Sequence, residues 1–230
     1  MNRIAIMQPT YLPWAGYFYL CSSVDTFVYL DDVQFERRSW QSRNRILLDG
    51  REHFLTVPCN KVSQDTLIKE ITICNSVDWI KSHITRIEIG YPDFPDKSDF
   101  IRSVTALMGH SEYLADVNIG LIEYFMQLLD IRCETVRASD LNVRGRRSEH
   151  LADICYKLNA TSYLSPIGSR EYLEADNFTQ ISGIEPTYSN FDPLPYRQKD
   201  VIEFIPHLSV VDLIGSCGLG FARKYVRDSR

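Results

Sequence analysis

Two adjacent carboxylates, Asp31 and Asp32, begin the stretch of this sequence that is densest in side chains able to do chemistry. The residues that follow, up to position 45, add amides, cations and an aromatic ring: Gln34, Arg37, Arg38, Trp40, Gln41, Arg43, Asn44 and Arg45. Guanidinium groups pair with phosphate through two parallel hydrogen bonds, and an indole ring offers a stacking face. The stretch therefore favours a nucleotide or nucleotide-linked substrate. A solvated basic loop that neutralises nearby carboxylates has the same composition, so both interpretations stay open.

A second group of candidate contacts lies in residues 8–18, directly after the apolar run 4–7 and directly before a helix-like run that ends near residue 22. Pro9, Pro13 and Gly16 interrupt regular structure there, which predicts a strand-to-helix turn. The side chains of this turn that we expect to contact a substrate are Gln8, Tyr11, Trp14 and Tyr17.

Two further turns carry anion-binding residue types. Ser165, Ser169 and Arg170 surround a glycine between an expected strand and an expected helix, where small residues let a phosphate approach backbone donors. Serine and glycine are also the ordinary residues of turns. The basic run 144–147 precedes a helix expected to start at Ser148, and a flexible surface turn is the competing interpretation.

The histidines are scattered, and two have notable surroundings. His83 lies on an expected helix, and His207 stands at the entry to the last expected helix, ten residues before Cys217. A thiol–imidazole pair would support acyl transfer. A spacing of ten along a helix does not place the two on one turn, so we expect Cys217 to be a buried thiol instead.

The elements that must position these residues alternate between strands and helices. Residues 4–7 and 26–30 read as buried strands joined by a helix, and 131–136 and 161–165 as later strands. An Asp49-Gly50 turn predicts a hairpin of 45–48 and 53–57, and residues 65–74 alternate as a further strand. Helices are expected over 79–87 with Ser76 or Asp78 as cap, and over 98–108, 113–129, 148–158, 171–173 and 209–218.

This order predicts an α/β fold: a mainly parallel Rossmann-like sheet flanked by helices, with an inserted β-hairpin at about 45–58. We expect one domain over 1–230, with an irregular part rich in proline and aromatic residues at about 185–230. Ligands of such sheets bind at the carboxyl ends of the strands, where the turn 8–18 and the stretch 31–45 would converge.

Composition excludes several classes of function. A net charge of −5 and a pI near 5.6 argue against nucleic acid as a partner. No apolar run approaches the roughly 20 residues of a spanning helix, and no signal peptide is recognisable, so we expect no membrane insertion and a cytoplasmic protein. Six cysteines without a CxxC pair, together with scattered histidines, predict no metal site.

The segments 7–18, 30–35, 39–45 and 204–213 resemble those of the WbqC-like family, over nearly the whole chain. That family is associated with bacterial surface polysaccharide gene clusters. The resemblance implies an acyl or aminoacyl (glycyl-type) transferase that forms an amide on a nucleotide-linked amino sugar in O-antigen lipopolysaccharide biosynthesis. It implies no cofactor, and an acyl or aminoacyl donor such as a carrier-protein thioester.

On this hypothesis Arg37, Arg43, Arg45 and Arg170 handle phosphates, and Trp40 or Trp14 stacks a ring. Gln8 and Asn44 orient amides or hydroxyls, and Asp31, Asp32 or His83 supplies the base. The other expected substrate contacts are Tyr11, Tyr17, Gln34, Ser165, Ser169 and His207.

Two alternatives remain. The chain also resembles, more faintly, the nucleotidylyltransferase superfamily, which implies an ATP-dependent adenylate-forming ligase, although both histidines of that superfamily's first turn are absent here. The second alternative is a non-catalytic protein that binds a sugar nucleotide.

Overall fold

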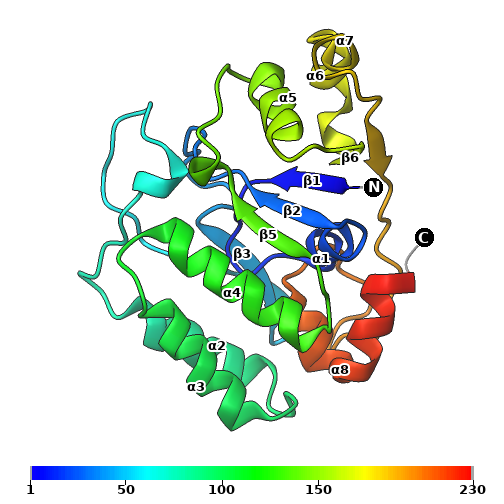
Figure 1. Cartoon of the computed structure of the whole chain (residues 1–230). Helices are drawn as coiled ribbons and strands as arrows, with labels where there is room; N and C mark the ends of the chain where they lie inside the picture. Colours follow the sequence, from blue (N-terminus) through cyan, green and yellow to red (C-terminus); the bar gives the residue numbers. More distant parts are fainter. Residues whose placement is uncertain (1, 229–230) are drawn as a thin grey trace.

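A computed structural model describes residues 2–228 and contains a five-stranded, fully parallel sheet (Figure 1). Its strands are β1 (Arg3–Met7), β2 (Thr26–Tyr29), β5 (Glu134–Arg137), β6 (Ser162–Pro166) and β7 (Thr187–Ser189). They lie in the order β5-β2-β1-β6-β7, with every neighbouring pair parallel. Counted along the chain this is 3-2-1-4-5, the order of Rossmann-like folds, and it confirms the predicted class.

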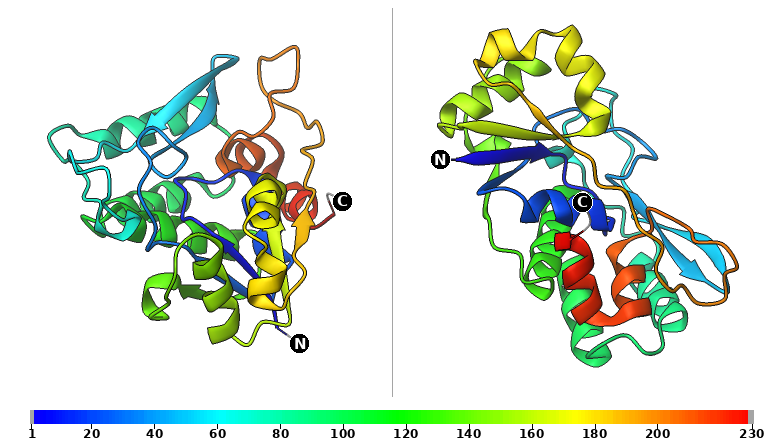
Figure 2. Two further views of the ribbon diagram at one scale, coloured as in Figure 1. Left: turned by 90° about the horizontal axis from the view of Figure 1, so that it is seen from above. Right: turned by 90° about the vertical axis from the view of Figure 1, so that its right-hand side faces the viewer.

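Helices cover both faces of the sheet, which is why the central strands are continuously apolar. Ile4 and Ile6 pack against one face cluster and Ala5 against the other, as the alternation along a strand requires. One face carries α1 (Ala15–Ser22), α4 (Leu114–Leu128) and α8 (Val210–Asp228); the other carries α5 (Ser148–Lys157), α6 (Arg170–Ala175) and α7 (Phe178–Ser182) (Figure 2). Helices α2 (Trp79–Gly90) and α3 (Lys97–Met108) lie beyond α4 (Figure 1).

The predicted hairpin is present as a separate two-stranded sheet of β3 (Arg43–Leu48) and β4 (Arg51–Thr56). Asp49 and Gly50 both have positive φ, 49° and 69°, which is the conformation of a two-residue hairpin turn and explains the Asp-Gly pair. The Asp78 carboxylate accepts a hydrogen bond from the Lys81 backbone N–H, so Asp78 is the cap of α2.

The prediction of a strand at 65–74 is wrong. This segment holds a short 3-10 helix, η1 (Ile68–Glu70), and makes only isolated bridges. The N–H groups of Ile68 and Lys69 donate to carbonyls of the loop after β2, Val33 and Asp31, instead of to a strand. Its alternating apolar residues Ile68, Ile71 and Ile73 are buried in the main hydrophobic cluster. Two more short 3-10 helices, η2 (Ala138–Asp140) and η3 (Ile167–Ser169), follow β5 and β6.

The C-terminal third contains more regular structure than the sequence predicts. Neither α7 nor β7 is predicted, because five and three residues are too few to show a recognisable periodicity. Helix α8 breaks at Gly218 (φ 79°, ψ 165°), as expected, but the chain resumes a helix and continues to Asp228.

Candidate functional site

The order of the sheet reverses between β1 and β6, and three adjoining cavities open at the carboxyl ends of these two strands. Their volumes are about 310, 220 and 260 Å³, and all three are lined by Met7, the last residue of β1. We call them together the β1/β6 cleft. The side chains that line it include Gln8, Thr10, Trp14, Tyr17, Trp40, Gln41, Asn44, Arg45, Ser165, Ser169, Tyr172 and His207.

The floor of the cleft is the turn that follows β1, and two buried asparagines hold it in place. Asn44 Nδ2 donates to the carbonyls of Tyr11 (3.1 Å) and Leu12 (2.8 Å), and Leu12 has a positive φ of 43°. Asn118 Nδ2 donates to the Pro9 carbonyl at 3.1 Å. Because prolines 9 and 13 remove two backbone donors from the turn, these side chains replace the hydrogen bonds of regular structure.

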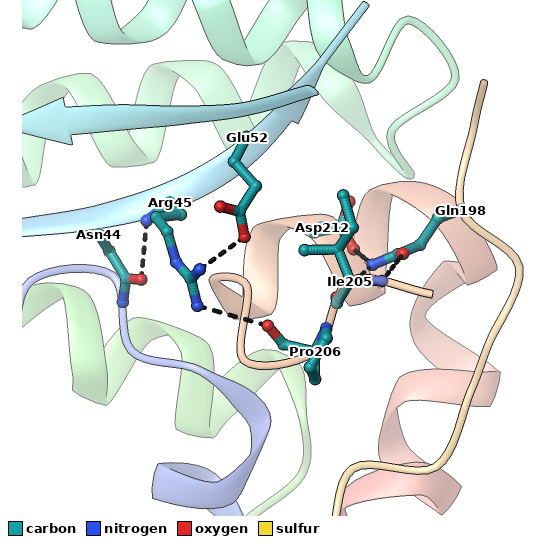
Figure 3. A network of polar contacts seen from close by, with 7 residues as sticks. All are labelled: Asn44, Arg45, Glu52, Gln198, Ile205, Pro206 and Asp212. Carbon is teal, nitrogen blue, oxygen red and sulfur yellow. Dashed lines mark hydrogen bonds and ion pairs between the residues drawn. The ribbon is translucent and has the colours of Figure 1, made fainter. Parts of the chain in front are cut away.

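One half of the cleft is aromatic and cationic. The rings of Trp14 and His207 meet edge to face with centroids 4.6 Å apart, and the Arg45 guanidinium lies 5.5 Å from the centroid of Trp40. Arg45 is fixed by an ion pair with Glu52 at 2.5 Å and by a 3.4 Å hydrogen bond to the Pro206 carbonyl (Figure 3). Its Nε is buried and has no hydrogen-bond partner within residues 2–228. An unpaired buried donor is costly, and a ligand acceptor would satisfy it.

His207 is carried by the segment 196–209, which a polar network ties to α8. Gln198 accepts from the Ile205 N–H (2.9 Å) and donates to the Ile205 carbonyl (3.0 Å) and to Asp212 (2.9 Å) (Figure 3). Tyr91 and Tyr196 also donate to Asp212, which is completely buried, and burial raises the pKa of this carboxyl.

The His207 imidazole makes no hydrogen bond to any residue in the described part of the chain, and its backbone is held at φ 60°. Partial burial and the Arg45 cation lower its pKa, with Asp192 opposing the shift. At neutral pH the ring is therefore uncharged and able to accept a proton.

The other half of the cleft presents amides and hydroxyls. Gln41 Nε2 donates to Gln8 Oε1 at 2.9 Å. Ser165, which is fully buried, places its Oγ 2.5 Å from Ser169 Oγ, and Ser169 in turn donates to the Pro166 carbonyl at 2.6 Å. Such groups suit the oxygens of a sugar or nucleotide.

The three residues predicted as bases lie outside the cleft lining. Both carboxylate oxygens of Asp31 accept hydrogen bonds from Ser139, from its N–H at 3.0 Å and its Oγ at 2.8 Å. Asp32 pairs with His150 at 3.1 Å. His83 is buried against Tyr11, with Nδ1 2.8 Å from the phenol oxygen, and burial lowers its pKa to about 4. Their contacts are those of residues that hold loops and helices together, and their catalytic roles stay predictions.

The other predicted contacts with charged or amide side chains lie in a separate cavity or against aromatic rings. Gln34 and Arg37 line a separate cavity of about 540 Å³ and donate to the backbone carbonyls of Gln64 and Val62. Arg43 lies over the Phe54 ring at 4.6 Å. Arg170 lies over Tyr188 and pairs with Glu174, outside the cleft lining. Cys217 is only partly buried and donates to the Arg197 carbonyl, so no thiol–imidazole pair with His207 forms.

Among the lining side chains named above, Thr10, Gln41 and Tyr172 are not expected substrate contacts from the sequence. Thr10 and Gln41 lie inside the segments 8–18 and 31–45, and Gln41 is one of the amides noted there, so position was the available signal. Tyr172 lies on α6, and nothing in its neighbourhood distinguished it. Within residues 2–228 no three His, Cys, Asp or Glu side chains gather closely enough to hold a metal ion, and no helix is long and apolar enough to cross a membrane.

The strand order defines a Rossmann-like α/β protein, and its cleft lies at the carboxyl edge of the sheet, where ligands of such folds bind. The model of the WbqC-like protein family matches residues 8–222, and the chain belongs to this family, which confirms the resemblance of its motifs. It is also similar to the uncharacterized protein Rv1507c of Mycobacterium tuberculosis, with 30% identity over 236 residues that cover 100% of both chains.

Proposed function

We propose that the protein transfers an acyl or aminoacyl group, of the glycyl type, to the amine of a nucleotide-linked amino sugar. The observation that carries this proposal is the free imidazole of His207 beside the unpaired Nε of Arg45, at the reversal point of the sheet. The place in surface polysaccharide biosynthesis, and the carrier-bound donor, are those that the family resemblance implies.

The chemistry of amide formation matches what these groups offer. The sugar amine attacks the carbonyl carbon of the donor, the new C–N bond forms, and His207 takes the proton that the nitrogen loses. For a thioester donor the C–S bond then breaks, and the departing thiolate takes that proton from His207. A neutral imidazole is required at the start, which agrees with the lowered pKa of His207.

The surroundings of His207 supply binding. The rings of Trp14 and Trp40 give faces for a base or sugar, and the Arg45 guanidinium would pair with a phosphate. His207 takes the role of base here because its ring is unpaired and lines the cleft, whereas His83 is hydrogen bonded to Tyr11 in the core.

The test is a mass-spectrometric screen of amino sugar nucleotides with glycyl and acyl thioesters, followed by His207→Asn. Asparagine tolerates the left-handed backbone at this position. We expect kcat to fall by about 10²- to 10⁴-fold with little change in melting temperature. The control is His110→Asn at an exposed position outside the cleft, which should retain full activity.

Other outcomes would replace the proposal. Full activity of His207→Asn would exclude His207 as the base. Product formation only with ATP, with release of pyrophosphate, would instead favour the adenylate-forming ligase. Saturable binding of a sugar nucleotide without product from any donor would favour the binding protein.

A further inference from the structure

The hydrogen bonds of Gln41 determine which end of the Gln8 amide faces the cleft. The backbone N–H of Glu36 lies 3.1 Å from the Gln41 side-chain oxygen, and a backbone N–H can only donate. The oxygen of Gln41 must therefore point at Glu36, which leaves its NH₂ group to face Gln8. There it donates to Gln8 Oε1 at 2.9 Å.

Gln41 has no freedom to reverse this arrangement. The residue is 1% exposed, and its backbone is fixed on both sides: the backbone N–H donates to Ser39 Oγ (3.3 Å), and the backbone carbonyl accepts from Asn118 Nδ2 (2.8 Å). A flipped amide would place two donors together at Glu36 and lose that hydrogen bond, because the backbone N–H of Glu36 cannot change its role.

Gln8 consequently has its acceptor occupied and its donors free. Its NH₂ group makes no hydrogen bond within residues 2–228, is accessible, and belongs to a side chain that lines the β1/β6 cleft. Free donors without a free acceptor require a ligand atom that accepts. A carbonyl or phosphoryl oxygen, which carries no proton and can only accept, meets this requirement without leaving a donor of its own unpaired.

We propose that Gln41 is a positioning residue that makes Gln8 a pure hydrogen-bond donor toward the cleft, so that the ligand group seated at Gln8 is a carbonyl or phosphoryl oxygen. The identity of the ligand as a sugar nucleotide rests on the proposed function; the polarity of Gln8 does not. A hydroxyl oxygen could accept from Gln8 as well, but its own proton would find no acceptor on this side chain, and a group that can only donate, such as an ammonium, is selected against.

The polarity is tested without any ligand by Gln41→Glu at pH 8. An ionised carboxylate accepts at both oxygens, so it keeps the Glu36 hydrogen bond and forces Gln8 to rotate and donate to it. In nitrogen-resolved NMR spectra we expect the Gln8 NH₂ protons to exchange rapidly with water in the wild type and to become protected in the variant. Protected Gln8 NH₂ protons in the wild type, or no change in Gln41→Glu, would overturn the proposal.

The ligand group is identified by titrating wild type and Gln41→Glu with uridine, UDP, UDP-glucosamine and UDP-N-acetylglucosamine. The four probes form a series in which each adds groups to the one before. Once the series reaches a probe that carries the oxygen seated at Gln8, we expect the variant to bind that probe and all later ones about 10- to 100-fold more weakly than the wild type does. A loss that begins at UDP indicates a phosphoryl oxygen, and one that begins at the N-acetyl sugar indicates an acyl carbonyl. A loss that already begins at uridine assigns Gln8 to the nucleoside, in which the uracil carbonyls are the proton-free oxygens that the proposal requires. A loss that begins at UDP-glucosamine, which adds hydroxyls and an amine, or no loss with any probe, would contradict the proposal.

Two controls separate charge from polarity. Gln41→Met removes the constraint without adding charge, and a smaller loss of the same probe is expected because Gln8 can then adopt either orientation. Gln180→Glu adds the same charge at an exposed position on α7 and should change nothing. If the wild type binds none of the four probes, the substrate class of the proposed function fails, and the exchange measurement alone decides the polarity of Gln8.

Discussion

At the scale of single residues, asparagine and histidine side chains in this protein differ in how many of their hydrogen bonds are already made by neighbouring residues. Asn44 was predicted to orient a substrate, yet its amide is committed to the carbonyls of Tyr11 and Leu12. His207 was predicted only to bind, and its ring is free at the cleft. A residue type reveals which hydrogen bonds are possible; the neighbours decide which are already made.

His83 predicts a dependence of stability on pH. Its pKa is lowered from 6.5 to about 4 in the folded protein. Between these two pH values the imidazole is protonated in the unfolded chain but neutral in the folded protein. Stability should therefore decrease as pH falls from 6.5 to 4, by up to about 3 kcal/mol from this group. In urea unfolding, His83→Gln should show a shallower decrease over that interval than the wild type.

His110→Gln, at an exposed position, is the matched control for this measurement and should keep the wild-type slope. An unchanged slope in His83→Gln would mean that His83 is protonated in the folded protein well above pH 4.

At the scale of elements, the segment 196–209 is held from two sides. Gln198 pairs with Ile205 and Asp212, while the Arg45 carbonyl accepts from the Ser209 N–H and the Pro13 carbonyl accepts from the Val210 N–H. His207 lies between these anchor points, so the geometry of the loop, more than any contact of the ring, determines where the imidazole stands.

Gln198→Ala should therefore weaken both stability and catalysis. It removes the hydrogen bonds to Ile205 and one donor to the buried Asp212, which should reduce the free energy of unfolding by about 1–3 kcal/mol. The transfer rate constant kcat should fall by about 10- to 100-fold as His207 loses its position. Urea unfolding and steady-state kinetics measure the two effects.

Gln180→Ala, on the exposed side of α7, is the corresponding control and should leave both quantities unchanged. If Gln198→Ala lowered stability but kept full kcat, the segment would not be what positions His207.

At the scale of the whole molecule, the cleft draws on distant parts of the chain: the turn after β1, the hairpin, the end of β6 and the segment 196–209. A single hydrophobic cluster includes Phe27 of β2, Ile46 of β3 and Leu213 of α8. This shared core supports our proposal that the chain is one domain.

A sugar nucleotide that occupies the cleft should stabilise these parts together. At a ligand concentration of 100 Kd the free energy of unfolding should rise by about 2.7 kcal/mol within one cooperative transition. Hydrogen exchange should slow in residues 196–209 and in the hairpin and stay unchanged in α3, which contributes nothing to the cleft lining. Separate transitions for the hairpin and the sheet would contradict the single domain.

Arg170→Ala serves as the control, because Arg170 lies outside the cleft and should not affect this stabilisation. Trp40→Ala should reduce it, since the Trp40 ring lines two of the three cavities.

Local patterns were sufficient for most elements of the fold. The apolar run of β1, the Asp-Gly turn of the hairpin and the cap at Asp78 each act within a few residues, so they are readable from the sequence. The segment around η1 was misjudged because its partners, the carbonyls of Val33 and Asp31, lie more than thirty residues away.

The sequence by itself determined the family, the parallel α/β class and the two segments, 8–18 and 31–45, that meet at one edge of the sheet. Only the tertiary structure decided which of their side chains remain available to a ligand. Gln8 and His207 keep unpaired polar atoms at the cleft. By contrast, Asp31 accepts hydrogen bonds from Ser139, and His83 is hydrogen bonded to Tyr11. Hydrogen bonds between residues far apart in the chain make this distinction, and no local pattern records them.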